Sequence, residues 1–363
     1  MSKKKKDDSG ALDMNMFTSA ADAVAARRAR TMVPVSPNLD LKLGGGILEG
    51  SLVLVQTWPK VGKTLLAMQI VRNALKQGRY VVYADVECRL DEIKYGVDKL
   101  QEQYGEKLML LKSSKETGVL SGNQIYEQIY KMTMIPKYYG TVYVIDSISH
   151  ATPKASLEDS EVKADRRDQN AKLNSDFCKK VGNYLRVSDS IVIGIQHLTA
   201  VQHQGQNPYT SIEADGGNKL QYEADIVLKA THKPKNLLGE DLHKGAHNHE
   251  GYDGQRIDWN IPFNKILKPY ISKDDPCQNY LLFEGGCWWA REALDILIEM
   301  GLVVVGGGGW HSFMTAEFSG KAQGDVKATA VVEEHREYFE KLIAQYFTDT
   351  FGANYDFRNT YNE

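Results

Sequence analysis

Residues 52–78 read LVLVQTWPKVGKTLLAMQIVRNALKQG, a continuous apolar run followed by a short turn and an apolar pattern at helical spacing. The run 52–56 predicts a buried strand, because strands that are covered on both faces lack alternation. The pattern over 63–78 predicts a helix that ends at Gly78, a residue type common at helix ends. The turn 57–64 therefore leads a strand into a helix N-terminus, where backbone N–H groups bind phosphate well.

The turn 57–64, TWPKVGKT, ends in the Gly-Lys-Thr of a nucleotide-binding P-loop. We expect Lys63 to reach the terminal phosphates of ATP and Thr64 to hold Mg²⁺. Thr57 stands where the motif asks for glycine, and Pro59 lacks an N–H donor, so both depart from the pattern. The sequence predicts nucleotide contact along the whole turn and its exit: Thr57, Trp58, Pro59, Lys60, Val61, Gly62, Lys63, Thr64 and Leu65.

Further apolar runs flank this segment and alternate with helical patterns. Such alternation is typical of an α/β fold with a doubly wound, mostly parallel sheet between layers of helices. The runs that predict buried strands are VVYA (81–84), TVYVI (141–145), IVIGI (191–195) and ADIVL (224–228).

Polar residues follow several of these runs, where catalytic groups of parallel sheets gather. Asp146 ends the run VYVID, and a carboxylate there can hold Mg²⁺ together with Thr64. Glu87 lies just beyond another run and could activate a water molecule for attack on the γ-phosphate. Gln196 or His197 could bind the γ-phosphate and sense its loss, and the sequence leaves that choice open.

The composition is that of an ordinary globular protein. The 363 residues are 42% hydrophobic and 25% charged, with a formal net charge of −3. Because no apolar stretch reaches the roughly 18 residues of a membrane span, we expect no membrane partner. Collagen-like and wholly disordered classes are also excluded. Nucleic acid would have to bind through local basic patches, because the global charge is not basic.

Changes in composition divide the chain. Residues 1–33 begin with a basic run and continue as an Ala-rich helical stretch, which predicts an N-terminal arm. Residues 34–284 hold the strand–helix alternation of the core. Within them, 232–258 is rich in Gly and His and predicts an exposed insertion. Residues 285–363 predict a small α+β C-terminal domain with a polar tail.

Several segments resemble the RecA family of recombinases, including its phage (UvsX-like) members, from about residue 34 to 345. The resemblance implies a RecA-like P-loop ATPase core. The segments that carry it are PVSPNLDLKLGGGILEGSLVLVQ (34–56), ADVECRLD (84–91), VIDSISHATPKASLE (144–158), GGNKLQY (216–222), FNKILKPY (263–270) and LLFEGGCWWAREALDILIEMGLV (281–303).

The resemblance implies an ATP-dependent and Mg²⁺-dependent DNA recombinase. Such a protein forms a helical filament of identical subunits on single-stranded DNA, pairs it with double-stranded DNA and exchanges strands. It implies a cytoplasmic location, which is the host cytoplasm for a phage protein, and single-strand-binding or mediator proteins as helpers. By this resemblance Glu87 is the catalytic glutamate and Lys265 reaches the ATP of a neighbouring subunit. From its position in the chain, Tyr95 is a candidate for stacking on adenine.

In this family two loops bind single-stranded DNA, and the resemblance puts them at about 152–169 and 199–217. The first loop offers cations for phosphate contact, although acidic neighbours make a solvated helical turn the alternative. The second has no Lys or Arg, so amides, backbone and a ring would make its contacts. The candidates are Lys154, Lys163, Arg166, Arg167, Gln202, Gln204, Tyr209, Gly216, Gly217 and Asn218.

Oligomerisation candidates come from both ends of the core. Phe17 and Ala20 lie in FTSA, which resembles the Phe-x-x-Ala polymerisation motif of archaeal and eukaryotic recombinases, although a helix start with an incidental Phe fits equally well. Tyr222 and Lys265 are the candidates from the core.

Three other functions are weighed against a recombinase. A ring helicase or a RadA/KaiC-like ATPase would share the fold, but the segment 285–345 argues against it. Thr57 and Pro59 favour a DNA-binding mediator that binds ATP and scarcely hydrolyses it. A P-loop kinase for small molecules would leave GGNKL and FNKILKPY unexplained.

Overall fold

The computed structural model describes residues 16–159, 167–203, 209–215, 220–230, 237–238, 254–265, 276–282 and 286–351. The chain forms two compact units, residues 1–31 and residues 32–363. The first unit contains α1 (Ala20–Ala29), and the hydroxyl of Ser19 caps it by accepting from the backbone N–H of Asp22 at 3.0 Å.

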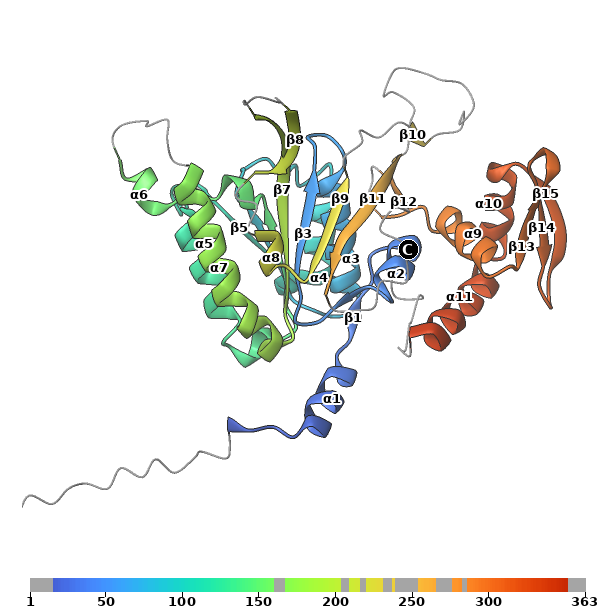
Figure 1. Cartoon of the computed structure of the whole chain (residues 1–363), viewed down its shortest axis with the longest axis horizontal. Helices are drawn as coiled ribbons and strands as arrows, with labels where there is room; N and C mark the ends of the chain where they lie inside the picture. Colours follow the sequence, from blue (N-terminus) through green and yellow to red (C-terminus); the bar gives the residue numbers. More distant parts are fainter. Residues whose placement is uncertain are drawn as a thin grey trace, which may run out of the picture. The chain divides into compact units, whose positions relative to one another are not determined.

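A large mixed sheet runs through the second unit (Figure 1). Its described strands lie in the order β10-β11-β9-β3-β7-β6-β4-β5, with β12 paired to β11 and β8 to β7. The six strands from β9 to β5 are parallel, whereas β8, β10, β11 and β12 pair antiparallel. The bounds are β3 Leu52–Thr57, β4 Val81–Asp85, β5 Leu108–Lys112, β6 Val142–Asp146, β7 Ile191–His203, β8 Tyr209–Ala214, β9 Ile226–Ala230, β10 Leu237–Leu238, β11 Gly254–Asn264 and β12 Cys277–Leu282.

Helices cover both faces of the parallel strands, because successive strand residues point to opposite sides. Val53 and Val55 belong to one buried cluster with α3 (Lys63–Lys76) and α4 (Val97–Tyr104). Leu52 and Leu54 belong to a second buried cluster. Its helices are α5 (Gly122–Met132), α7 (Arg167–Ser188) and α8 (Leu220–Glu223). The predicted doubly wound, mostly parallel α/β fold is therefore confirmed.

The C-terminal segment adds helices and a three-stranded antiparallel sheet. Its apolar side chains, such as Leu294 and Phe339, join the buried cluster that contains α3. Its elements are α9 Trp289–Glu299, β13 Val303–Gly306, β14 Trp310–Met314, β15 Ser319–Gln323, α10 Asp325–Glu334 and α11 Arg336–Phe351. The remaining short elements are β1 Met32–Val33, α2 Pro37–Leu43, β2 Ile47–Leu48, α6 Lys154–Leu157 and the 3₁₀ turns Gly105–Lys107, Pro136–Tyr138, Ile148–His150 and Gly307–Gly309.

Two predicted boundaries are corrected. The arm ends at Thr31 instead of residue 33, because Met32 and Val33 pair with Leu48 and Ile47 of the core. The insertion 232–258 ends before Gly254, where β11 begins and pairs with β12. Its residues 232–236 and 239–253 lie outside the described residues.

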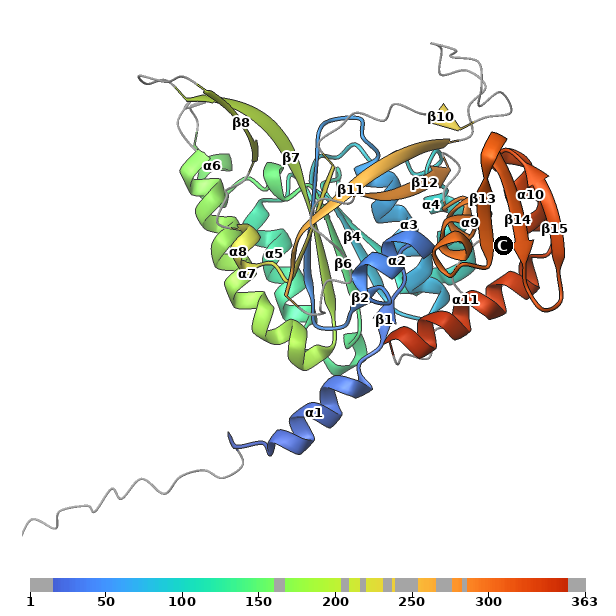
Figure 2. The same cartoon turned by 45° about the vertical axis from the view of Figure 1, so that its right-hand side comes forward.

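The predicted DNA-binding loop 199–217 is partly described, and its described residues form a hairpin. Residues Thr199 to His203 continue β7 and pair antiparallel with Tyr209 to Glu213 of β8. Figure 2 shows this β7–β8 hairpin running out beyond the helical layers. Alternating exposure along residues 200–203 fits a two-stranded ribbon in which the chain leaves the covered sheet.

Among the helices that the structure describes, none combines the length and hydropathy that a bilayer crossing requires.

Candidate active site

The carboxyl ends of four parallel strands bring the predicted groups together. Thr57 of β3 is in register with His197 of β7, and Asp85 of β4 is in register with Asp146 of β6. Glu87 follows β4 by two residues. Open parallel sheets bind their ligands at this edge, because turns, helix N-termini and strand ends meet there.

Thr57 causes no strain in the turn. It is the last residue of β3, fully buried, and is paired with His197 and Ala230 on its two sides. A β-branched residue suits such a position. The left-handed backbone falls instead on Lys60, with φ of 65°, and Gly62, with φ of 103°. The departure from the motif at Thr57 is therefore accommodated by the strand.

Gly62 is favoured by its left-handed backbone, and a larger residue would also have to displace two side chains of β11. A Cβ at this position would lie 2.2 Å from Nε2 of Gln255 and 2.8 Å from Cδ1 of Ile257. Gln255 also donates a hydrogen bond to the carbonyl of Val61 at 2.9 Å. The side chain of Val61 is buried, whereas Pro59 and Lys60 are exposed at the tip of the turn. β11 thus supports the turn from behind.

Lys63, Glu87 and His197 form a compact charged cluster at the start of α3. Lys63 Nζ lies 2.5 Å from His197 Nε2 and 3.7 Å from Glu87 Oε1. His197 Nε2 lies 2.8 Å from the same Glu87 oxygen. His150, in the turn after β6, places Nδ1 3.1 Å from Glu87 Oε1.

Glu87 is held ionised in this cluster. Burial favours its neutral form, but hydrogen bonds from His150, His197 and Ser147 and the charge of Lys63 outweigh burial. The pKa of Glu87 therefore lies well below its usual range. An ionised carboxylate can accept a proton or orient a water molecule.

Thr64 and Asp146 supply an all-oxygen site beside the cluster. Thr64 Oγ1 donates to Asp146 Oδ2 at 3.1 Å, and the hydroxyl of Tyr83 donates to the same oxygen at 2.7 Å. Burial raises the pKa of Asp146, although hydrogen bonds from Tyr83 and Thr64 and the charge of Lys63 oppose this. A hydroxyl and a carboxylate at this separation fit Mg²⁺, which prefers oxygen ligands.

Gln196 faces away from the phosphate cluster. Its Oε1 accepts from Gln56 Nε2 at 2.9 Å, and its Nε2 donates to the carbonyl of Asp215 at 3.1 Å. Adjacent strand residues point to opposite faces, so only His197 of the two candidates reaches Lys63 and Glu87. Gln196 links β3 to the base of the β7–β8 hairpin instead.

Comparison with known proteins agrees with this architecture. The sequence matches the family model for the RecA N-terminal domain over residues 19–249. The chain belongs to the RecA family. It is 26% identical over 322 residues to the protein RecA of Nostoc sp., which covers 88% of this chain and 80% of that protein. Similar matches are RecA of Nitratiruptor sp., 26% identical over 317 residues (85% and 80%), and of Rippkaea orientalis, 27% over 325 residues (88% and 83%).

Tyr95, Tyr222 and Lys265 lie outside the phosphate cluster of this RecA-family chain. Tyr95 is partly buried in the turn before α4, and burial raises its pKa. Lys265 and Tyr222 meet each other, since Nζ of Lys265 donates to the Tyr222 carbonyl. Tyr222 is 66% exposed and its ring lies 6.5 Å from that of Phe263. Trp58 is partly buried against the core, and Leu65 is buried.

The predicted DNA-binding residues of the family member are only partly described. Lys154 begins α6, is exposed, and pairs with Glu158 at 3.4 Å. Gln202 and Tyr209 are exposed on the hairpin. Lys163, Arg166, Gln204, Gly216, Gly217 and Asn218 lie outside the described residues, and of Arg167 only the backbone, which begins α7, is described.

Sequence reasoning missed several residues of the RecA-family site, among them His150 and Tyr83. His150 contacts Glu87, and Tyr83 contacts Asp146. A histidine four residues after the Walker B aspartate is the signal that could have found His150. In the sequence Tyr83 is one more residue of an apolar strand, so the contact of its hydroxyl with Asp146 could be found only in the structure.

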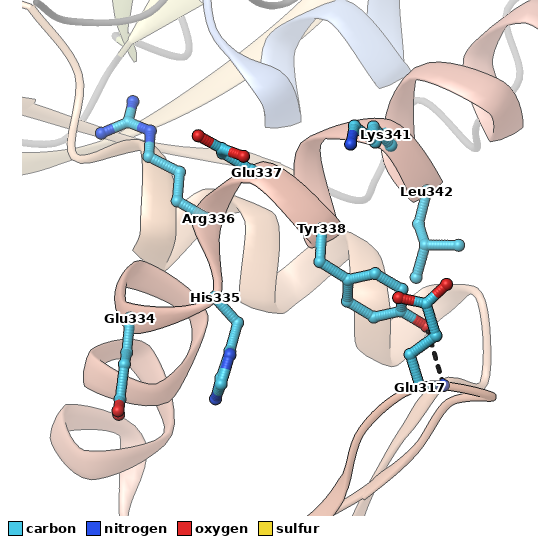
Figure 3. Close-up of a pocket in the computed structure, with 8 residues that line it drawn as sticks. All are labelled: Glu317, Glu334, His335, Arg336, Glu337, Tyr338, Lys341 and Leu342. Atoms are coloured by element: carbon cyan, nitrogen blue, oxygen red, sulfur yellow. Dashed lines mark hydrogen bonds between the residues drawn. The ribbon is translucent and has the colours of Figure 1, made fainter.

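A cleft of about 580 Å³ lies elsewhere, around the junction of α10 and α11. Figure 3 shows the side chains that line it, among them His335, Arg336 and Tyr338. The dashed contact joins the backbone N–H of Glu317 to the hydroxyl of Tyr338 at 3.4 Å. Because Glu317 and residues between 334 and 342 line this cleft, it does not extend to the phosphate turn.

Proposed function

We propose that this chain is a DNA-dependent ATPase that forms filaments on single-stranded DNA and exchanges DNA strands in recombination and repair. The observation that carries the proposal is the convergence of Lys63, Glu87 and His197 beside the Thr64–Asp146 pair. RecA-family membership supports the DNA-linked use of this ATPase site.

The proposed roles follow from charge and position. Lys63 holds the terminal phosphates, and Thr64 with Asp146 holds Mg²⁺, which neutralises phosphate charge when it is bound. Glu87 activates the attacking water by orienting it, because its carboxylate is ionised and next to the phosphate turn. His197 contacts both Lys63 and Glu87 and takes the role of γ-phosphate sensor.

The hairpin offers a physical connection to DNA. His197 and Gln196 are neighbours on β7, and Gln196 bonds to the carbonyl of Asp215 at the hairpin base. Ser149 adds a second link, because it accepts from the N–H of His197 and donates to the Asp215 carbonyl, both at 3.1 Å. Loss of the γ-phosphate can therefore be transmitted from His197 through these hydrogen bonds to the second proposed DNA-binding loop, residues 199–217.

DNA contact is proposed for both predicted DNA-binding loops, residues 152–169 and 199–217. Lys154 of the first loop contacts a DNA phosphate, and Gln202 and Tyr209 of the second loop make uncharged contacts with DNA. Subunit contact is proposed for Phe17, Ala20, Tyr222 and Lys265, and adenine stacking for Tyr95. The domain proposal, with the corrected limits, is an arm 1–31, a core 32–284 and a C-terminal domain 285–363.

Finer features of the proposal rest on the family resemblance. We retain a phage (UvsX-like) origin, with its host-cytoplasmic location and single-strand-binding or mediator helpers. Identities of only 26–27% to bacterial RecA proteins are compatible with a divergent member. Thr57 lies in a regular strand, so it no longer favours the alternative of a mediator that binds ATP without hydrolysing it.

The first test measures ATP turnover with and without single-stranded DNA for the natural chain, Glu87→Ala and a control, Glu102→Ala, on exposed α4 surface. We expect DNA to stimulate turnover, and Glu87→Ala to lower it by about 10²- to 10⁴-fold, the typical contribution of a general base. Nucleotide binding should persist, because Lys63 and Thr64 remain.

Two outcomes would contradict the assignment. Negligible turnover of the natural chain, despite ATP and DNA binding, would favour the mediator function. Equal ATP turnover of Glu87→Ala and Glu102→Ala would show that Glu87 has no catalytic role. Strand exchange is the next assay if DNA-stimulated turnover is found, and electron microscopy then separates helical filaments from closed rings.

A further inference from the structure

Glu87, His150 and His197 form a cluster in which two histidines accompany the catalytic carboxylate, a combination that also suits a metal ion. One carboxylate oxygen and two imidazole nitrogens all lie within 4.8 Å of one another. Two of the separations, from Glu87 Oε1 to His150 Nδ1 and to His197 Nε2, are 3.1 and 2.8 Å. Ligands of one zinc ion lie about 2.0–2.2 Å from the metal, so small outward shifts would admit an ion.

We infer that Glu87, His150 and His197 are a binding site for a transition-metal dication of the Zn²⁺ type. Two imidazoles and one carboxylate suit such an ion, whereas Mg²⁺ prefers oxygen ligands and fits Thr64 and Asp146. The inferred site is therefore chemically separate from the Mg²⁺ site, although both border the phosphate turn.

The surroundings suit an exchangeable ion. The His150 side chain is 49% exposed, which gives a route from solvent, whereas Glu87 and His197 are 9% and 16% exposed. Three protein ligands leave a fourth position open to water. The Ser147 hydroxyl lies 2.8 Å from the same His150 Nδ1, so this contact is given up when that nitrogen binds an ion.

Lys63 competes with a metal ion at this position. Its ammonium lies 2.5 Å from His197 Nε2, so it and a dication on that nitrogen exclude each other by distance and charge. In the proposed function the phosphates of ATP draw Lys63 toward themselves. On that basis ATP and the metal ion favour each other's binding, whereas the metal site itself does not depend on the proposed function.

A bound ion would stop hydrolysis and leave nucleotide binding intact. The Glu87 oxygen that coordinates the metal can no longer accept a proton or orient water. Lys63 and Thr64 remain available to the nucleotide. Zn²⁺ is thus expected to act as an inhibitor that holds the ATP-bound state.

The site is tested first by binding alone. Zn²⁺ titration calorimetry and the visible absorption of Co²⁺ would be measured on the full chain, with His243, His247 and His249 replaced by Ala to remove a second histidine group. We expect one ion per chain, with affinity at least about tenfold weaker in His150→Ala and His150→Gln and unchanged in the control His335→Ala. Lys63→Met should bind the ion several-fold more tightly.

The outcomes separate the site from the proposed function. Equal affinity in His150→Ala and His335→Ala, or no tetrahedral Co²⁺ spectrum, would overturn the metal site. Thermal unfolding of His150→Ala shows whether the half-exposed position is needed for folding, and His150→Gln keeps the test valid if it is.

The inhibitory role is tested at fixed Mg²⁺ and ATP with increasing Zn²⁺. Turnover should fall over the concentrations that fill the site, with at least tenfold resistance in His150→Gln. Filling without inhibition would overturn the inhibitory role. A chain that binds Zn²⁺ as expected but hydrolyses no ATP would contradict the proposed function and leave the metal site supported.

Discussion

At the scale of single residues, Glu292 is a buried carboxylate that joins three elements. It lies in α9, is 0% exposed, and accepts from the backbone N–H groups of Asn38 and Tyr280 at 2.9 and 2.8 Å. The side-chain amide of Asn279 also donates to it at 2.8 Å. Burial nevertheless raises the pKa of Glu292 to about 7.

The raised pKa predicts a loss of stability with rising pH. Between about pH 4.5 and 7 the folded chain keeps the Glu292 proton and the unfolded chain releases it, so the free energy of unfolding falls over this window and levels off above it. The expected contribution is about 3 kcal/mol. Urea unfolding across this range should show a flatter pH dependence for Glu292→Gln than for the natural chain; parallel curves would contradict the assignment.

Residue positions also show what sequence could and could not decide at the site. Lys63, Thr64, Glu87 and Asp146 were predictable, because a motif or a strand end marks each of them. The choice between Gln196 and His197 was not, since neighbouring strand residues face opposite ways and the sequence does not reveal which face holds the phosphate. The structure puts His197 beside Lys63.

At the scale of elements, continuous apolar runs predicted strands well and mixed patterns did not. The runs at 52–56, 81–84, 141–145 and 191–195 became β3, β4, β6 and β7 with shifts of one residue at most at their starts. β11 was missed because it follows a polar segment and because residues 260–264 are partly exposed throughout. The hairpin was hidden because polar residues dominate 199–214.

The β7–β8 hairpin predicts a DNA contact made by stacking. The rings of His203 and Tyr209 stack at 4.5 Å with an interplanar angle of 15°, and Tyr209 is 62% exposed. Base stacking is worth about 1–3 kcal/mol, so Tyr209→Ala should weaken single-stranded DNA binding by about 5- to 100-fold. Fluorescence anisotropy at several salt concentrations would measure this effect.

The matched variant for the anisotropy measurement is Lys154→Ala, in the first proposed DNA-binding loop. Loss of one phosphate contact should reduce the slope of log affinity against log salt by about 0.7, the value for a single strand. Tyr209→Ala should leave the slope unchanged, because it removes no charge. A changed slope in Tyr209→Ala, or unchanged affinity, would contradict stacking.

At the scale of the whole molecule, two buried clusters explain how the site is held. One cluster joins α3, one face of the sheet and the C-terminal segment, and the other joins α5 and α7 to the opposite face. The strand ends that carry Glu87, Asp146 and His197 leave a sheet that is fixed on both sides. Hydrophobic patterning alone predicted this sheet, whereas the packing of the C-terminal segment into the α3 cluster required long-range contacts.

The N-terminal unit carries a prediction about assembly. Phe17 is 62% exposed, immediately before the capped helix α1. If Phe17 enters a pocket of an adjacent subunit, its burial contributes about 1.5–3 kcal/mol, so Phe17→Ala should raise the concentration needed for filaments by about 10- to 100-fold. Thr18→Ala, in the same exposed segment, should leave it unchanged. Sedimentation and electron microscopy with ATP and single-stranded DNA would measure this; equal assembly of both variants would show that Phe17 is only an incidental helix-start residue.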